Sequence, residues 1–130
     1  MRRNCTIPER QGFRPDTDEK KGRRDFFKNG WTARHTGDRI CFQFLCSCIA
    51  VQYRKTIHRP APAASLILDG DTAHPVSLDS NFSEDWGDCL YLCPILHHGV
   101  RKVHTVEIEI TGTDPGDLVP FYLLSIITAG

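Results

Sequence analysis

The residues of this sequence best suited to bind another molecule are gathered in a polar segment around Trp86. The face of an aromatic ring packs well on the apolar face of a sugar ring, and nearby carboxylate or amide groups bind sugar hydroxyls. Such groups lie close to the tryptophan in the chain, and they are Asn81, Asp85, Asp88 and Tyr91. We therefore take residues 79–88, with Tyr91, as the candidate ligand-binding segment. Packing of Trp86 within the protein is the alternative.

The cysteines and the acidic turn residues favour structural roles over metal binding. No two of the six cysteines have the C-x-x-C spacing of zinc sites, and they are Cys5, Cys41, Cys46, Cys48, Cys89 and Cys93. Free buried thiols are favoured over disulfides, because the chain begins without the apolar stretch of an export signal. Zinc held by cysteines with His97 and His98 is the weaker alternative. Asp69 and Asp71 flank Gly70, which favours a turn over a calcium site. We expect no metal and no cofactor.

His104 opens the clearest strand pattern of the sequence. It has no partner of a catalytic type beside it in the chain, so we expect its imidazole to anchor the strand start by hydrogen bonding to backbone. A role as a ligand or a base is the alternative.

Composition narrows the classes of partner. The 130 residues suit one domain, with 40% hydrophobic residues and equal numbers of basic and acidic side chains, 16 of each. A neutral chain lacks the positive field that binds nucleic acid or an anionic membrane. No apolar run is long enough to span a bilayer. We expect neither a nucleic-acid nor a membrane partner, and a cytoplasmic location is favoured.

Two regions of the sequence differ in charge content and in the pattern of their apolar residues. Residues 1–24 are rich in charge and poor in apolar residues, so we expect a flexible tail or linker there. From residue 25 to residue 130, short runs of alternating apolar and polar residues are separated by turn residues. Val106, Ile108 and Ile110, for example, alternate with Thr105, Glu107 and Glu109.

The spacing of these runs predicts the fold. We expect strands at 40–46, 48–54, 65–68, 72–78, 89–92, 104–111 and 121–127, with a further short one near Trp31. Ser47 would join the first two strands as neighbours, and Pro94 would stop the strand that begins at Cys89. No segment has a helical period. The prediction is an all-β domain, an antiparallel jelly-roll β-sandwich of about eight strands.

The order of several motifs resembles a known domain family. The motifs are Trp31, Thr36-Gly-Asp-Arg-Ile-Cys-Phe42, a strand ending at Tyr53, Leu66-Ile-Leu-Asp-Gly70, His104-Thr-Val-Glu-Ile-Glu-Ile110 and Val119-Pro-Phe-Tyr-Leu-Leu-Ser125. Over residues 25–128 this order resembles the galactose-binding-like jelly-roll accessory domain that stands beside SGNH (GDSL-type) esterases, including many bacterial carbohydrate esterases. The segment from His98 to Val103 is longer than the usual short turn of that family.

The resemblance brings no catalytic apparatus. An SGNH esterase uses a Gly-Asp-Ser nucleophile turn and a late Asp-x-x-His pair. Asp71 and His74 have the spacing of the late pair, but no nucleophile turn precedes them. We therefore assign no catalytic residue.

Three functions follow from the resemblance. The leading one is a non-catalytic accessory module, with carbohydrate as its candidate ligand and an SGNH hydrolase domain as its candidate partner. The alternatives are a truncated or divergent SGNH-type esterase, which would hydrolyse acetyl esters alone, and a structural module that packs on a catalytic domain.

Overall fold

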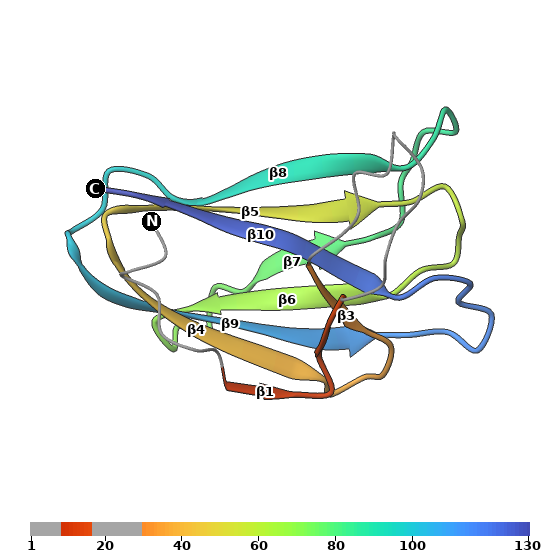
Figure 1. The fold of residues 1–130 in the computed structure, drawn as a ribbon, viewed down its shortest axis with the longest axis horizontal. Coiled ribbons are helices and arrows are strands. Elements are labelled where there is room, and N and C mark those ends of the chain that lie inside the picture. Colours follow the sequence, from red (N-terminus) through yellow and green to blue (C-terminus); the bar gives the residue numbers. More distant parts are fainter. Residues whose placement is uncertain (1–8, 17–29) are drawn as a thin grey trace.

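The computed structural model describes residues 9–16 and 30–130, and within them the chain forms two antiparallel sheets of five strands each (Figure 1). The first sheet has the order β1-β4-β9-β6-β7 and the second the order β2-β3-β10-β5-β8. Their bounds are β1 Glu9–Gln11, β2 Arg14–Pro15, β3 Trp31–Ala33, β4 Arg39–Cys46, β5 Cys48–Lys55, β6 Ala63–Leu68, β7 Val76–Asp79, β8 Cys89–Leu96, β9 Lys102–Gly112 and β10 Phe121–Ala129. No helix long and apolar enough to cross a membrane occurs in these ranges.

The core forms between the sheets from the residues that alternate inward. In β9 the side chains of Val106, Ile108 and Ile110 are fully buried, whereas the intervening positions are more open to solvent. Alternating residues of other strands are buried in the same core or packed against it, and they are Phe42, Phe44, Val51, Leu66, Leu68 and Leu123. Trp31 packs against the same cluster, with its ring edge-to-face on Phe42 at 6.5 Å. The all-β sandwich prediction is confirmed.

Part of the expected tail belongs to the sandwich, which corrects the interpretation of residues 1–24. β1 pairs with β4, and β2 pairs with β3. Between them the Phe13 ring is buried against Phe121, with the ring centroids 6.2 Å apart. One large apolar side chain in a charged segment thus anchors residues 9–16. The remaining residues of the expected tail lie outside the described ranges, as do Asp25, the Phe26-Phe27 pair and Cys5.

The junction at Ser47 also differs from the prediction. β4 and β5 are not paired neighbours, because β4 pairs with β1 and β9 while β5 pairs with β10 and β8. The chain passes from one sheet to the other at Ser47. Cys46 and Cys48 therefore lie in strands of opposite sheets.

Pro94 does not end its strand. β8 continues to Leu96, with Pro94 opposite Ala50 and a register shift between Ile49 and Ala50. β8 is the edge of its sheet, and an edge strand tolerates a residue that has no N–H to donate.

Candidate functional site

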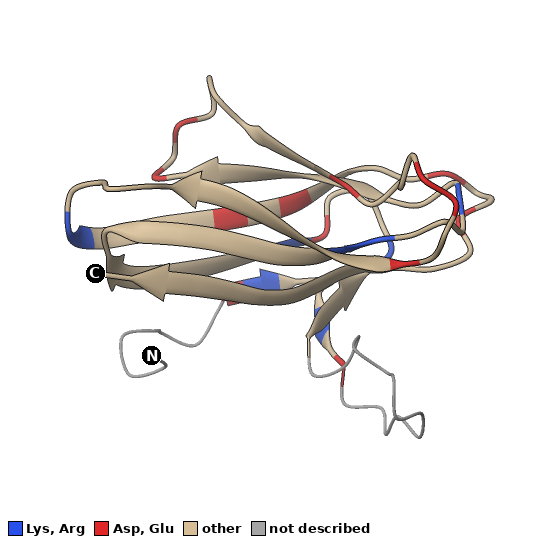
Figure 2. Ribbon diagram, turned by 90° about the horizontal axis from the view of Figure 1, so that it is seen from above, with Lys and Arg blue, Asp and Glu red and all other residues tan. Residues whose placement is uncertain are grey.

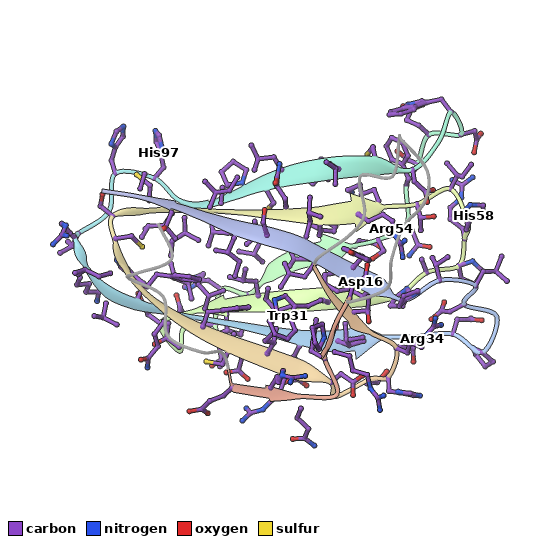
Figure 3. The ribbon with its side chains drawn as sticks, viewed as in Figure 1. Asp16, Trp31, Arg34, Arg54, His58 and His97 are labelled. Carbon is purple, nitrogen blue, oxygen red and sulfur yellow. The ribbon has the colours of Figure 1, made fainter. Side chains whose placement is uncertain are left out.

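The predicted ligand-binding segment lies at one end of the sandwich. Loops 34–38, 56–62, 80–88 and 113–120 leave the strands there, on the right of Figure 1. Figure 2 shows acidic residues in several of these loops. Arg34, Arg54 and His58 lie at this end in Figure 3. Charged side chains from several loops are therefore gathered at this end of the sandwich.

Trp86 is the most open aromatic side chain of the described part, with 71% of its surface exposed. Its ring stands edge-to-face against Phe82, at 5.2 Å between centroids and 84° between planes. The ring is thus supported from one side by another aromatic ring, while most of its surface faces solvent. This geometry suits a stacking platform.

Arg59 fixes the loop that carries the tryptophan. Its Nη1 donates to the Phe82 carbonyl at 2.6 Å, and its Nη2 donates to Asp85 Oδ1 at 2.5 Å. Two bonds from one planar guanidinium hold the loop in a defined orientation. Arg59 does not stand out in the sequence, because it lies more than twenty residues before its partners.

Asn81 and Asp88 tie loop 80–88 to loop 56–62. The Asn81 amide bonds both backbone groups of Ala61, accepting from its N–H at 2.9 Å and donating to its carbonyl at 2.8 Å. Asp88 Oδ1 accepts from the Thr56 hydroxyl at 2.8 Å and from the Ile57 N–H at 3.0 Å. These two predicted ligand-binding residues therefore use polar atoms within the protein, where they position the loop.

Tyr91 lies on β8 beyond the loop, with 43% of its surface exposed. Its ring packs edge-to-face on the buried ring of Tyr53 at 5.6 Å, and Lys55 Nζ lies 4.5 Å from its centroid. Trp86, Asp85 and Tyr91 are thus the predicted site residues whose side chains are open to solvent at this end.

His104 is part of a different constellation, at the opposite end of the sandwich. Its Nδ1 lies 2.7 Å from Asp69 Oδ2, and its Nε2 lies 2.8 Å from the Val100 carbonyl. A carbonyl oxygen can only accept, so Nε2 donates to it. Asp69 Oδ1 also accepts from the Thr105 N–H at 2.8 Å. The expected backbone anchor is confirmed, and Asp69 is a partner that sequence analysis missed.

These contacts set the acidity of Asp69. Burial alone would raise the pKa of its carboxyl, but the hydrogen bonds from His104 and from the Thr105 N–H outweigh burial and leave the pKa below its ordinary value. The ionised carboxylate is therefore the form that the fold favours. Asp69 and Gly70 both have positive φ, of 53° and 74°, which is the backbone of a tight turn.

The remaining candidates from the sequence are the cysteines, a metal site and the Asp71–His74 pair. The five cysteines in the described ranges have free thiols, and burial raises the pKa of Cys41, Cys46, Cys89 and Cys93. Within the same ranges no three histidine, cysteine or acidic side chains are grouped as a metal site. His74 Nδ1 lies 3.0 Å from Asp71 Oδ2, so the Asp-x-x-His pair does meet in space, on an exposed turn.

Solved structures give this fold a context. No protein-family model and no curated protein matches the chain. A two-domain esterase active on acetylated mannans matches 95% of the chain at 47% identity and a TM-score of 0.89, and the match covers 34% of the esterase. A family two carbohydrate esterase from Clostridium thermocellum matches 91% of the chain at 16% identity and a TM-score of 0.57, over 31% of its own length.

A carbohydrate-binding module of about the same length as this chain has the same fold. A family 35 carbohydrate-binding module from Cellvibrio japonicus matches 95% of the chain, and 95% of that module is covered, at 15% identity and a TM-score of 0.53. The fold is therefore that of the jelly-roll carbohydrate-binding modules. The chain spans about a third of the length of the esterases that it matches. The chain is thus similar to one domain of a two-domain carbohydrate esterase, and it has the jelly-roll fold that its sequence motifs indicated.

Proposed function

We propose that this domain binds a chain of neutral sugars on the Trp86 side of its loop end and holds an esterase domain close to that polysaccharide. The observation that carries the proposal is an indole ring with 71% exposure on a loop held by Arg59, Asn81 and Asp88. An exposed ring that is already ordered stacks on a sugar with little loss of conformational entropy. Tyr91 would extend the aromatic surface, and Asp85 would accept from sugar hydroxyls.

The similar proteins suggest the sugars to test. The two-domain esterase was crystallised with mannopentaose, and the Clostridium thermocellum esterase with cellohexaose. Over the matched part, which is 34% of its length, the first esterase is 47% identical to this chain, and it acts on acetylated mannans. We therefore propose a mannan-type chain as the ligand class, and an esterase domain, of SGNH type, as the partner.

The test is titration calorimetry of the domain with mannopentaose and cellohexaose. Trp86→Ala should weaken binding about tenfold or more, since truncation of an aromatic anchor at the centre of a binding surface costs about 2 kcal/mol or more, while Trp86→Phe should keep part of the affinity. The melting temperature should stay nearly unchanged because the ring is largely outside the core.

Val100→Ala is the matched control. Val100 is 72% exposed and lies at the opposite end of the sandwich, so its truncation should change neither binding nor stability. Equal binding by wild type and Trp86→Ala would refute the platform. A large drop in melting temperature for Trp86→Ala would instead mark the ring as a packing residue.

A further inference from the structure

A concave surface that Trp86 does not line lies at the same end of the sandwich. It is a cleft of about 330 Å³ between loop 34–38 and loop 113–120. Arg34 and His35 line it from the first loop, and Asp114 and Asp117 from the second. Pro62 and Val119 add apolar surface to its lining. Donors and acceptors thus come from opposite loops and enclose one space.

The cleft is preformed by bonds within and between the two loops. Thr36 and Thr113 join them through their hydroxyl oxygens, 2.9 Å apart. Asp38 Oδ2 accepts from the backbone N–H of Arg34 at 3.3 Å and of His35 at 3.0 Å. On the other loop, the Asp114 N–H donates to Asp117 Oδ2 at 3.0 Å. Binding a ligand would therefore cost little entropy in ordering these walls.

Two groups in the cleft have unused hydrogen-bonding capacity. Asp117 Oδ1 is buried and accepts no hydrogen bond from the residues that the structure describes. The Arg34 guanidinium forms no ion pair with any acidic side chain of the same ranges. A buried carboxylate oxygen without a donor is costly, and this oxygen is closed to solvent, so a turn of the Asp117 side chain toward a ligand hydroxyl in the cleft would be favoured.

The charges select among possible ligands. The cleft has two carboxylates and one guanidinium, so an anionic sugar would meet net repulsion. A hydroxyl of a neutral sugar donates to a carboxylate and accepts from a guanidinium at the same time. We propose that this cleft is a second carbohydrate subsite, which takes one neutral pyranose unit of the chain that stacks on Trp86.

Loop 56–62 connects the two subsites. Pro62 lines the cleft, and Arg59 of the same loop bonds Phe82 and Asp85 beside Trp86. Figure 3 places His58, at the tip of this loop, at the same end of the sandwich as Arg34. A sugar chain that crosses loop 56–62 would contact both subsites.

This inference rests on the proposed function, and one set of titrations tests the two separately. We expect Asp117→Asn and Arg34→Ala each to weaken mannopentaose binding about tenfold, the usual effect of losing a hydrogen bond to a charged group. The amide side chain of the Asp117→Asn variant keeps a carbonyl oxygen for the Asp114 N–H, so the melting temperature should change little. Arg34→Ala leaves the backbone N–H bond to Asp38 in place, which keeps the test valid if the other variant is unstable. Asp71→Asn, at the opposite end, is the control and should bind as wild type does.

The outcomes separate the two proposals. Weaker binding only in Trp86→Ala would overturn the second subsite and leave the platform standing. Weaker binding only in the cleft variants would overturn the Trp86 platform and leave the cleft standing as the sugar site. No binding of any neutral oligosaccharide by wild type would overturn both. Tighter binding of glucuronic acid than of mannose, or a Ca²⁺-induced rise in melting temperature that Asp117→Asn abolishes, would overturn the assignment to a neutral sugar.

Discussion

At one end of the sandwich, loops 34–38, 56–62, 80–88 and 113–120 carry exposed or unsatisfied groups, whereas at the other end the polar groups of Asp69 and His104 are bonded to each other and to backbone. His104 is 3% exposed and uses both ring nitrogens, while Trp86 is 71% exposed. Asp69 uses both carboxylate oxygens, while Asp117 keeps a buried one without a donor among the described residues.

Carboxylates and aromatic rings therefore have different roles at the two ends, where one set stabilises the fold and the other is available to a ligand. A carboxylate whose oxygens are all bonded within the protein stabilises the fold and has nothing left for a ligand. A buried carboxylate oxygen without a donor lowers stability, and an exposed ring adds little to it, so both keep bonding capacity for a ligand. Substitutions at the two ends should consequently separate stability from binding.

The largest effect is expected for His104→Ala. It removes two hydrogen bonds, leaves the Val100 carbonyl and the Asp69 carboxylate without their partner, and opens a buried space. We expect a loss of about 3 kcal/mol of unfolding free energy, the low end for a broken buried pair because Asp69 can regain water. Urea unfolding would measure it. Mannopentaose binding below the transition should be unchanged, and a loss of binding in the folded variant would contradict the division between the two ends.

Asn81→Ala should have the next largest effect, on both properties. It takes away the bonds that tie loop 80–88 to the buried Ala61 backbone. We expect a loss of about 1–2 kcal/mol of stability, together with severalfold weaker sugar binding, because the platform loop is no longer held. Asp79→Asn, which keeps an oxygen for the Asn81 N–H, is the milder companion. Full affinity in Asn81→Ala would show that this bond does not organise the site.

Acid should weaken the end that holds His104. The pKa of Asp69 is lower in the folded protein than the ordinary value near 3.9 of an unfolded chain. In that window the unfolded state binds more protons, so the stability contributed by the Asp69 carboxylate is present above about pH 4 and is lost as pH falls through the folded pKa. Asp69→Asn should flatten this part of the profile, measured by thermal melts between about pH 6 and pH 2.5. An identical profile in wild type and Asp69→Asn would count against it.

The smallest effect concerns the thiols. Burial raises the pKa of Cys46 and Cys89, so both should react slowly with a thiol reagent at neutral pH. Cys46 is fully buried, whereas Cys89 is partly open beside loop 80–88, so Cys89 should be labelled first. Peptide mapping by mass spectrometry would rank the two. Faster labelling of Cys46 would show that the end with His104 opens more readily than the loop end.

Sequence alone predicted the strands and the core where one face alternates clearly. Val106, Ile108 and Ile110 were assigned correctly because a period of two fixes which side is buried. It did not predict the passage between sheets at Ser47, because alternation continues on both sides of it. Phe13 was missed because a single apolar residue among charges has no period.

The candidate site was predictable only in part. Trp86 stood out because an aromatic ring in a polar loop is unusual, and the structure leaves it open to solvent. The roles of Asn81 and Asp88 depend on loop 56–62, which lies some twenty to thirty residues away in the chain. The cleft joins loop 34–38 to loop 113–120. No local pattern shows that such distant segments meet.

The position of β10 governs when the fold can form during synthesis. β10 lies between β3 and β5 in the middle of its sheet, yet it is the last strand in chain order (Figure 1). Until residues 121–129 have left the ribosome, β3 can pair only with β2 and β5 only with β8, so each of them has one unpaired edge. Pairing across such long stretches of chain is slow. The nascent domain therefore keeps these two strand edges unpaired until its last strand is made, and unpaired edges favour aggregation.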